Sequence, residues 1–415
     1  MRELYDLTQK EERLVLVAVA TQDGDDTKDS LEELEELART AGAATVAKVI
    51  QNRESVHPGT YIGKGKMEEV KELVYSLGAT GVVCDDELSP AQLKNLEDVL
   101  QTKVMDRTVI ILDIFAQHAN TKEGKIQVEL AQLRYRATRL VGMRNSMSRL
   151  GGGIGTRGPG EKKLEVDRRL VRDRISQLKR ELTEVKQNRE TARELRNKSI
   201  TPIVAIVGYT NAGKSTLLNH LTGSKVLEED KLFATLDPTT RSLFLPGGEQ
   251  VLFTDTVGFI RKLPHHLIDA FRSTLEEAKH ADLILHVVDA ANPCAYKQMH
   301  VVYDTLHQLN IKEKKIITAL NKQDLLTNDQ IIKDFKADKT IKISARENTG
   351  IEKLKEAIEE ILRDRKVLIE RIFSYQEAGK IQLMRKYGQL LIEDYREDGI
   401  YVKAYLPRDM YHSLK

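Results

Sequence analysis

The 415-residue chain contains no tryptophan, and aromatic residues make up only 5% of it. Its two cysteines, Cys84 and Cys294, stand alone without the spacing of metal ligands. This argues against a disulfide scaffold and predicts two reduced core thiols in a cytoplasmic protein. No apolar run approaches about 18 residues, so the sequence predicts no membrane span. The first residues, 1–6, lack the apolar core of a signal peptide.

The formal net charge is small, +2, but the charges are unevenly distributed. Residues 1–120 carry 13 Lys and Arg against 23 Asp and Glu, whereas residues 121–200 carry 21 against 10. A strongly basic module predicts a polyanionic partner, and RNA is the obvious candidate. The length allows two to four domains.

One stretch fits a phosphate-binding loop between a strand and a helix. Residues 203–207 are β-branched and apolar, as in a buried parallel strand, and residues 216–221 continue as a predicted helix. Between them lies G-x-x-x-x-G-K-S. Its glycines let backbone N–H groups converge on the β-phosphate, its lysine lies between the β- and γ-phosphates, and its serine ligates Mg²⁺. The predicted phosphate-binding residues are Gly208, Tyr209, Thr210, Asn211, Ala212, Gly213, Lys214 and Ser215.

A second motif follows the apolar strand predicted at residues 251–255. Asp255, Thr256, Val257 and Gly258 fit D-x-x-G. In this pattern the carboxylate reaches Mg²⁺ through a water molecule, and the glycine N–H contacts the γ-phosphate. The sequence therefore predicts a second group of nucleotide-binding residues here.

A base-reading motif, N-K-x-D, follows the strand predicted at residues 315–320. Its aspartate accepts hydrogen bonds from N1–H and the exocyclic amine of guanine, whereas adenine offers neither donor. Backbone N–H groups after a further strand, at residues 340–343, can meet the guanine O6. The predicted base-binding residues are Asn321, Lys322, Gln323, Asp324, Ser344, Ala345 and Arg346. Together the motifs predict a GTP-binding domain.

Residues 231–241 must supply a threonine that reaches both Mg²⁺ and the γ-phosphate in the triphosphate state. Thr235, Thr239 and Thr240 all qualify on spacing, and the residues alone do not choose between them. Arg241 has two interpretations, a catalytic group or an exposed residue at the start of a strand.

The glutamine that positions the attacking water in many GTPases is absent, and Phe259 stands in its place. An aromatic ring cannot orient water by hydrogen bonding, so we expect slow intrinsic hydrolysis. Catalytic groups supplied by a partner can be worth about three to five orders of magnitude. Hydrolysis is therefore predicted to depend on a partner.

The predicted fold class is α/β, in four parts. Residues 1–118 alternate strands and helices, which is typical of a small parallel α/β domain. Residues 119–199 form a basic helical hairpin, residues 200–364 the P-loop GTPase domain, and residues 365–415 a small α+β module.

Two segments allow more than one interpretation. The hairpin tip is glycine-rich, and its Arg149, Arg157, Lys162 and Lys163 suit contact with an RNA backbone; a solvated hairpin with a flexible tip is the alternative. Residues 52–66 are either a surface or RNA-facing loop, or a second nucleotide site without a recognised phosphate loop.

Three runs resemble the HflX family of translation-associated GTPases, and the resemblance covers essentially the whole chain. They are GGGIGTRGPGE at residues 151–161, FATLDPTTR at residues 233–241 and DTVGFI at residues 255–260. The resemblance implies binding to the large ribosomal subunit and its rRNA, with the hairpin tip toward the peptidyl-transferase region. It also implies splitting of stalled ribosomes in the GTP state and hydrolysis stimulated by the subunit.

The resemblance also implies roles for particular residues. Thr235 joins Ser215 as a Mg²⁺ ligand, and Lys214, Thr235 and Gly258 carry catalysis. The resemblance implies that a hydrophobic residue such as Phe259 is typical of this family at that position. Asn211 resembles the asparagine of potassium-assisted GTPases, although use of K⁺ stays open. Some members are reported to bind ATP through the N-terminal domain, but no motif here establishes that site. The implied switch contacts to nucleotide are Phe233, Ala234, Thr235, Leu236 and Asp237.

The sequence thus predicts a cytoplasmic, monomeric GTPase that binds GTP or GDP with Mg²⁺ and acts on the large ribosomal subunit. One alternative is a signalling or ribosome-assembly switch that acts through a protein partner. Another, a small-molecule kinase, is disfavoured because N-K-x-D selects guanine and no acceptor pocket is evident.

Overall fold

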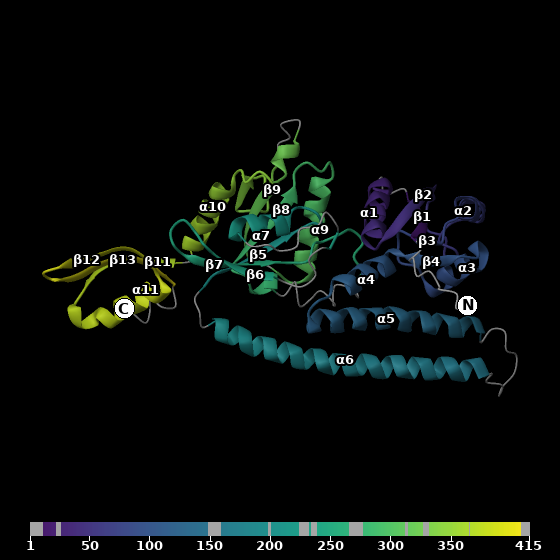
Figure 1. Cartoon of the computed structure of the whole chain (residues 1–415), viewed down its shortest axis with the longest axis horizontal. Helices are drawn as coiled ribbons and strands as arrows, with labels where there is room; N and C mark the ends of the chain where they lie inside the picture. Colours follow the sequence, from purple (N-terminus) through teal and green to yellow (C-terminus); the bar gives the residue numbers. More distant parts are fainter. Residues whose placement is uncertain are drawn as a thin grey trace, which may run out of the picture. The chain divides into compact units, whose positions relative to one another are not determined.

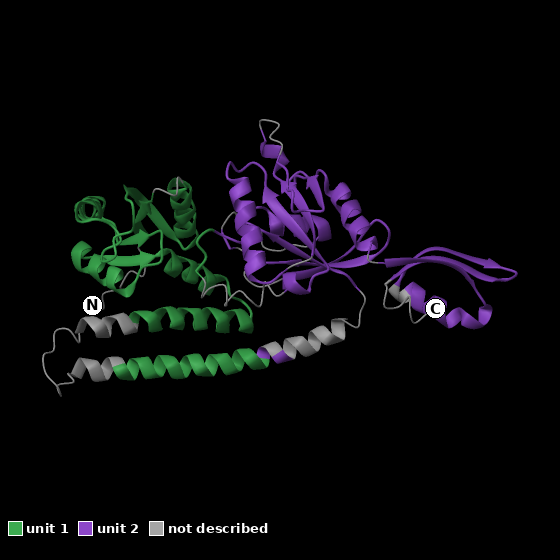
Figure 2. Ribbon diagram, turned by 180° about the vertical axis from the view of Figure 1, so that it is seen from behind, with its two compact units in different colours: residues 1–184, 261–270 green, residues 185–260, 271–415 purple. Residues whose placement is uncertain are grey.

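The structure is a computed structural model. It describes residues 11–21, 26–147, 159–197, 201–223, 232–233, 239–264, 277–311, 314–326, 332–364 and 366–407. Contacts divide the chain into two compact units (Figure 2). Unit 1 comprises residues 1–184 and 261–270, and unit 2 comprises residues 185–260 and 271–415.

Unit 1 contains the predicted parallel α/β domain. Its sheet has the order β2-β1-β3-β4, with every neighbouring pair parallel. The strands are β1 (Glu12–Ala20), β2 (Ala43–Asn52), β3 (Gly81–Cys84) and β4 (Lys103–Asp106). The helices are α1 (Thr27–Thr40), α2 (Lys64–Leu77), α3 (Pro90–Leu100) and α4 (Arg107–His118). The expected alternation of strands and helices is confirmed.

Local sequence signals explain where these elements begin. The Ser89 hydroxyl accepts a hydrogen bond from the Gln92 N–H, and Pro90 occupies the first turn, as expected for a capped helix start. Cys84 is a free, buried thiol, and burial raises its pKa well above the usual value. Among the described residues, Cys294 likewise takes part in no disulfide.

Two long helices follow along the chain, α5 (Lys122–Met147) and α6 (Pro159–Asn197), and α6 passes from unit 1 into unit 2 at residue 185 (Figure 1). The Arg174 guanidinium on α6 donates to both carboxylate oxygens of Glu129 on α5, at 2.7 and 3.0 Å. On α5 the Tyr135 hydroxyl donates to Asp106 at 2.8 Å, which ties the helix to the end of β4. The predicted helices are confirmed, whereas the glycine-rich tip, with Arg149 and Arg157, lies outside the described residues.

Unit 2 is built on a six-stranded sheet of order β10-β9-β8-β5-β7-β6, in which only β6 runs antiparallel to its neighbour. The strands are β5 (Ile203–Gly208), β6 (Thr239–Phe244), β7 (Gln250–Asp255), β8 (Leu283–Asp289), β9 (Lys315–Asn321) and β10 (Lys339–Lys342). The helices are α7 (Lys214–Thr222), α9 (Ala295–Gln308), the 3-10 turn η1 (Gln323–Leu325) and α10 (Ile351–Arg363). This is the predicted P-loop GTPase fold.

A small antiparallel sheet of order β11-β13-β12 completes unit 2. Its elements are β11 (Lys366–Phe373), η2 (Tyr375–Glu377), α11 (Ala378–Tyr387), β12 (Gln389–Arg396) and β13 (Gly399–Pro407). The Gln389 amide donates to the Gly247 carbonyl at 2.8 Å, which anchors this module next to the large sheet. The four-part division of the chain stays a prediction.

Candidate nucleotide-binding site

The predicted nucleotide-binding residues follow the carboxyl ends of neighbouring strands in the unit 2 sheet. β5 leads into the phosphate-binding loop, β7 ends at Asp255, and β9 ends at Asn321. Because β5, β7 and β9 run in the same direction, these ends meet at one edge of the sheet. The topology therefore brings the separate motifs together.

The phosphate-binding loop adopts a backbone that requires its glycines. A Cβ atom on Gly208 would lie 2.2 Å from the Val287 carbonyl oxygen on β8. Gly213 has φ +90°, and a Cβ there would lie 2.3 Å from Nδ2 of Asn321. Asn211 also has positive φ, 59°, a conformation that asparagine tolerates better than most residues. The loop can therefore pack tightly against β8 and the base-reading motif.

Lys214 is buried at the start of α7, and its Nζ donates to the Tyr209 carbonyl at 2.7 Å. Burial lowers its pKa to about 8, although the nearby Asp255 carboxylate opposes the shift. Nucleotide phosphates would supply negative charge at this ammonium group and favour its protonated form. Lys214 is thus placed as the predicted phosphate-binding cation.

Ser215 and Asp255 are brought together as a set of oxygen donors. The Ser215 hydroxyl donates to Oδ2 of Asp255 at 2.8 Å, and the Asp255 side chain is fully buried. Thr256, the next residue, donates its hydroxyl to the Ile206 carbonyl at 2.7 Å and so fixes the end of β7 against β5. Hydroxyl and carboxylate oxygens are hard ligands of the kind that Mg²⁺ prefers, so these residues fit the ion.

The D-x-x-G segment contacts the phosphate-binding loop directly. A Cβ on Gly258 would lie 2.9 Å from Lys214 Nζ and 2.7 Å from Thr210 Cγ2. The next residue, Phe259, donates its N–H to the Gly208 carbonyl at 3.1 Å and accepts from the Thr210 N–H at 2.8 Å. The Phe259 side chain is buried, only 2% exposed. It packs in the core and offers no polar group to a water molecule.

The base-reading residues are held by one another and by the phosphate-binding loop. Asn321 donates from Nδ2 to the Ala212 carbonyl at 2.9 Å and accepts from the Ala345 N–H at 2.9 Å. The Ser344 hydroxyl donates to Asp324 Oδ1 at 2.6 Å. Asn321 therefore joins the phosphate and base halves of the site, and Ser344 orients the carboxylate predicted to read guanine.

The described residues also include Lys322, Phe233 and Arg346. The Lys322 ammonium forms an ion pair with Asp289 Oδ2, at the end of β8, at 2.7 Å, and no motif in the sequence indicates this contact. Phe233 is buried with φ 59°. Arg346 follows Ala345 and is exposed. The predicted switch residues Ala234, Thr235, Leu236 and Asp237 lie outside the described residues.

Three further features are the surroundings of His57, clusters of metal-ligating side chains and helices that could cross a membrane. His57 Nδ1 accepts from the Thr60 N–H at 3.1 Å within the turn of residues 57–61, so this side chain stabilises its own loop. In the described part of the chain, no group of three His, Cys, Asp or Glu residues is arranged to hold a metal ion. Among the same residues, no helix is both long enough and apolar enough to cross a membrane.

Three family models match successive parts of the chain. Residues 28–116 match "GTP-binding GTPase N-terminal", residues 118–196 match "GTP-binding GTPase Middle Region", and residues 203–322 match "50S ribosome-binding GTPase". A GTP-binding protein from the archaeon Sulfolobus solfataricus, solved in complex with GDP, aligns at 24% identity and a TM-score of 0.44 over 84% of this chain and 98% of that one.

Curated relatives match over most of their length. A GTPase HflX from Lacrimispora saccharolytica is 65% identical over 414 residues, which cover 100% of this chain and 98% of that protein. The GTPase HflX of Escherichia coli K12 is 45% identical over 77% of this chain and 76% of its own length. With its P-loop site and its full-length match to the Lacrimispora relative, the chain belongs to the HflX family of ribosome-binding GTPases, which hydrolyse GTP.

Proposed function

We propose that this GTPase binds the large ribosomal subunit through rRNA and splits stalled ribosomes in its GTP state. The observation that carries the proposal is the full-length match to HflX relatives, which includes the basic helices as well as the GTPase domain. A match confined to the GTPase domain would support nucleotide hydrolysis only. We further propose that the protein acts as a cytoplasmic monomer.

At the nucleotide site, Lys214 binds the β- and γ-phosphates, and the Gly258 N–H binds the γ-phosphate. Ser215 and Thr235 would hold Mg²⁺, with Asp255 orienting the Ser215 hydroxyl. When bound, Mg²⁺ neutralises charge that develops on the phosphates. Asp324 reads guanine, and Asn211 is the residue through which K⁺ would act.

Hydrolysis in this proposal is stimulated by the ribosomal subunit. The position after Gly258 is occupied by Phe259, which is buried and cannot orient water. A group supplied by the partner would complete the site and could raise turnover by about three to five orders of magnitude. The triphosphate state would then last until the protein reaches its partner.

The excess of Lys and Arg in residues 121–200 supports RNA as the polyanion. Helices α5 and α6 carry this charge, and pairing as in Arg174–Glu129 neutralises only part of it. Binding to RNA releases counterions, so affinity should fall steeply as salt increases.

Multiple-turnover GTPase assays with and without purified large subunits test the proposal. We expect strong stimulation by the subunit, together with cosedimentation in the presence of a non-hydrolysable GTP analogue. Equal turnover in both assays and no cosedimentation in any nucleotide state would contradict it. Small subunits at the same concentration provide the matched control.

The alternative is a signalling or assembly switch whose output is a protein partner. A salt titration of binding to protein-free rRNA separates the two hypotheses. The RNA-binding proposal predicts a steep linear fall of log affinity with log salt. Absence of rRNA binding, with stimulation retained by ribosomal proteins alone, would favour the alternative.

A further inference from the structure

The chain leaves unit 2 immediately after the segment that contacts the phosphate-binding loop. Phe259 pairs with the loop backbone, whereas Arg261 and Lys262 belong to unit 1. Lys262 has φ 51°, a conformation that is unfavourable for a non-glycine residue and so must be held by its surroundings. The contacts of the Arg261 and Lys262 side chains therefore show what holds this segment.

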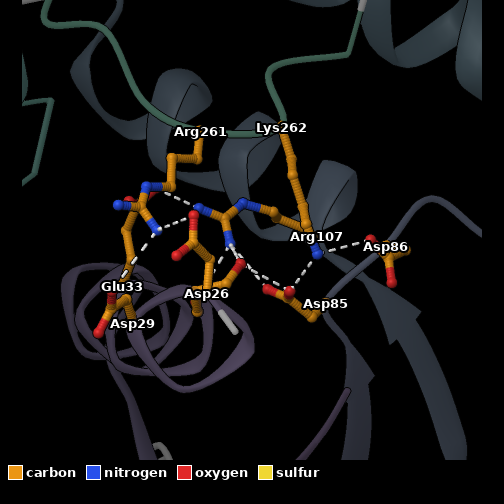
Figure 3. Close-up of polar contacts among 9 residues, drawn as sticks. Asp26, Asp29, Glu33, Asp85, Asp86, Arg107, Arg261 and Lys262 are labelled. Atoms are coloured by element: carbon orange, nitrogen blue, oxygen red, sulfur yellow. Dashed lines mark hydrogen bonds and ion pairs between the residues drawn. The ribbon is translucent and has the colours of Figure 1, made fainter. Parts of the chain in front are cut away.

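Lys262 forms ion pairs with two successive carboxylates at the end of β3 (Figure 3). Its Nζ lies 2.5 Å from Asp85 Oδ2 and 2.6 Å from Asp86 Oδ1. The Asp85 side chain is fully buried and also accepts from Arg107 Nη1 at 2.8 Å and from Ser30 Oγ at 2.7 Å. Asp85 is thus at the centre of a fixed network and is not a flexible surface group.

Arg261 extends the same network toward α1. Its Nη1 lies 3.9 Å from a carboxylate oxygen of Asp26 and 3.9 Å from one of Asp29. Arg107, which is 1% exposed, also forms an ion pair with Glu33 on α1. Figure 3 shows the three cationic side chains converging on these acids.

Residues 261–262 supply much of the positive charge in this cluster. Five carboxylates, those of Asp26, Asp29, Glu33, Asp85 and Asp86, meet three cations, Arg107, Arg261 and Lys262. Two of the three cations come from the chain directly after D-x-x-G. Without them, the five carboxylates would share one cation of the cluster, Arg107, and the excess negative charge would be unfavourable. The acids therefore hold residues 261–262 in a definite position.

The segment that connects this cluster to Gly258, the residue proposed to contact the γ-phosphate, is short. Only three residues separate Gly258 from Lys262, and an extended chain spans at most about 3.6 Å per residue. Phe259 is itself bonded to the phosphate-binding loop at both its N–H and its carbonyl. The position of Lys262 therefore restricts where Gly258 can lie, because few residues connect the two.

We propose that Asp85 and Asp86 are positioning residues for GTP hydrolysis, which act through Lys262 to hold the Gly258 N–H beside Lys214. This rests on the proposed contact between Gly258 and the γ-phosphate. In this structure Gly258 lies beside Lys214, since a Cβ on Gly258 would come within 2.9 Å of Nζ. GDP lacks that phosphate, so the ion pairs affect turnover of GTP and not affinity for GDP.

The test uses the full-length protein without ribosomes, so its outcome does not depend on the ribosomal proposal. Lys262→Ala and Asp86→Asn should each lower kcat for GTP by about three- to thirtyfold, the range expected for energetic coupling between sites. The dissociation constant of fluorescently labelled GDP should stay unchanged. The double variant should be no slower than the slower single variant, because both changes break one pair.

Two variants serve as controls. Tyr61→Phe removes a hydrogen bond of 2.6 Å to Asp86 but leaves the Lys262 pair in place, so kcat should stay within about twofold of the unaltered protein, as for a change outside the coupled pair. Lys262→Arg keeps the cation and should retain most of the rate. Gly258→Ala tests the underlying contact separately, and normal turnover in that variant would refute the role of Gly258 itself.

Unchanged kcat in both Lys262→Ala and Asp86→Asn would overturn the proposal. An equal loss of GDP affinity and kcat would also overturn it, because that indicates general damage. Hydrogen exchange on the unaltered protein covers the case in which variants fail to fold. Exchange of residues 26–33 and 85–86 should differ between GDP and a non-hydrolysable GTP analogue, and identical exchange in the two states would contradict the coupling.

Discussion

The Ser215 hydroxyl lies 2.8 Å from Oδ2 of Asp255, 40 residues later in the chain. This contact joins the helix that follows the phosphate-binding loop to the end of β7. It places a hydroxyl and a buried carboxylate where a hard cation is expected in a P-loop site.

Ser215→Ala should remove a Mg²⁺ ligand. We expect GTP turnover to fall by about two orders of magnitude, because a catalytic metal ion contributes several kcal/mol of charge stabilisation. The dependence of nucleotide affinity on Mg²⁺ concentration should become shallow. Thr222→Ala, at the other end of α7, is the control, since its hydroxyl donates to the Leu218 carbonyl within the helix. Turnover of Ser215→Ala at the normal rate would remove the metal assignment.

Asp324→Asn should change base selectivity without disrupting the fold. Its carboxylate accepts from Ser344, so the amide can keep one hydrogen bond while it loses the acceptor pair for guanine. Discrimination of this kind can reach four to five orders of magnitude, so we expect GTP affinity to fall by at least about a hundredfold and xanthosine triphosphate affinity to rise. Competition binding measures both changes. The control is Asp338→Asn, directly before β10, and unchanged selectivity in Asp324→Asn would refute the base-reading role.

Affinity for GTP should weaken as pH rises above about 8. Burial lowers the pKa of Lys214 to about 8 in the nucleotide-free site, and bound phosphates should raise it again. Binding is therefore accompanied by proton uptake near this pH and is favoured at lower pH. Calorimetry in buffers of different ionisation enthalpy measures the uptake. Lys214→Arg should show no such uptake, and a pH-independent affinity between pH 7 and 9 in the unaltered protein would contradict the prediction.

Stability should fall as pH drops below about 6.5, the ordinary pKa of histidine. His286 is buried on β8, with its ring 5.2 Å from that of Tyr303 in an edge-on arrangement. Burial lowers the pKa of His286, although Asp334 opposes this shift. The unfolded chain thus binds a proton that the native protein does not, which costs up to about 1.4 kcal/mol per pH unit until the native histidine titrates.

Urea denaturation between pH 8 and pH 5 measures this loss of unfolding free energy. His286→Asn should have a flatter profile over that range. Asp334 produces a separate effect at lower pH. Burial would raise its pKa, but hydrogen bonds from neighbours that include Thr318 and Tyr303 outweigh burial and lower it. The contribution of Asp334 to the free energy of unfolding is therefore present above about pH 4 and is lost below it. A pH-independent free energy above pH 5 would contradict the role of His286.

Much of the nucleotide site follows from local sequence. The phosphate-binding loop and the N-K-x-D motif are runs of consecutive residues, so their spacing alone predicts which groups converge. The alternation of strands and helices predicted for residues 1–118 is likewise local, and the structure confirms it from β1 to α4. Thr235 was chosen by resemblance and not by spacing, and it stays a prediction.

Contacts between distant residues could not be predicted in the same way. Asn321 donates to the Ala212 carbonyl across 109 positions, and Lys262 pairs with Asp85 across 177. An Arg-Lys pair after D-x-x-G and an Asp-Asp pair after a strand are visible in the sequence, but each is also typical of an exposed turn. The sequence by itself determined the chemistry of the GTPase site, because that chemistry depends on short, fixed spacings. Only the tertiary structure decided which acids receive Lys262, because a long-range ion pair depends on where the folded strands end.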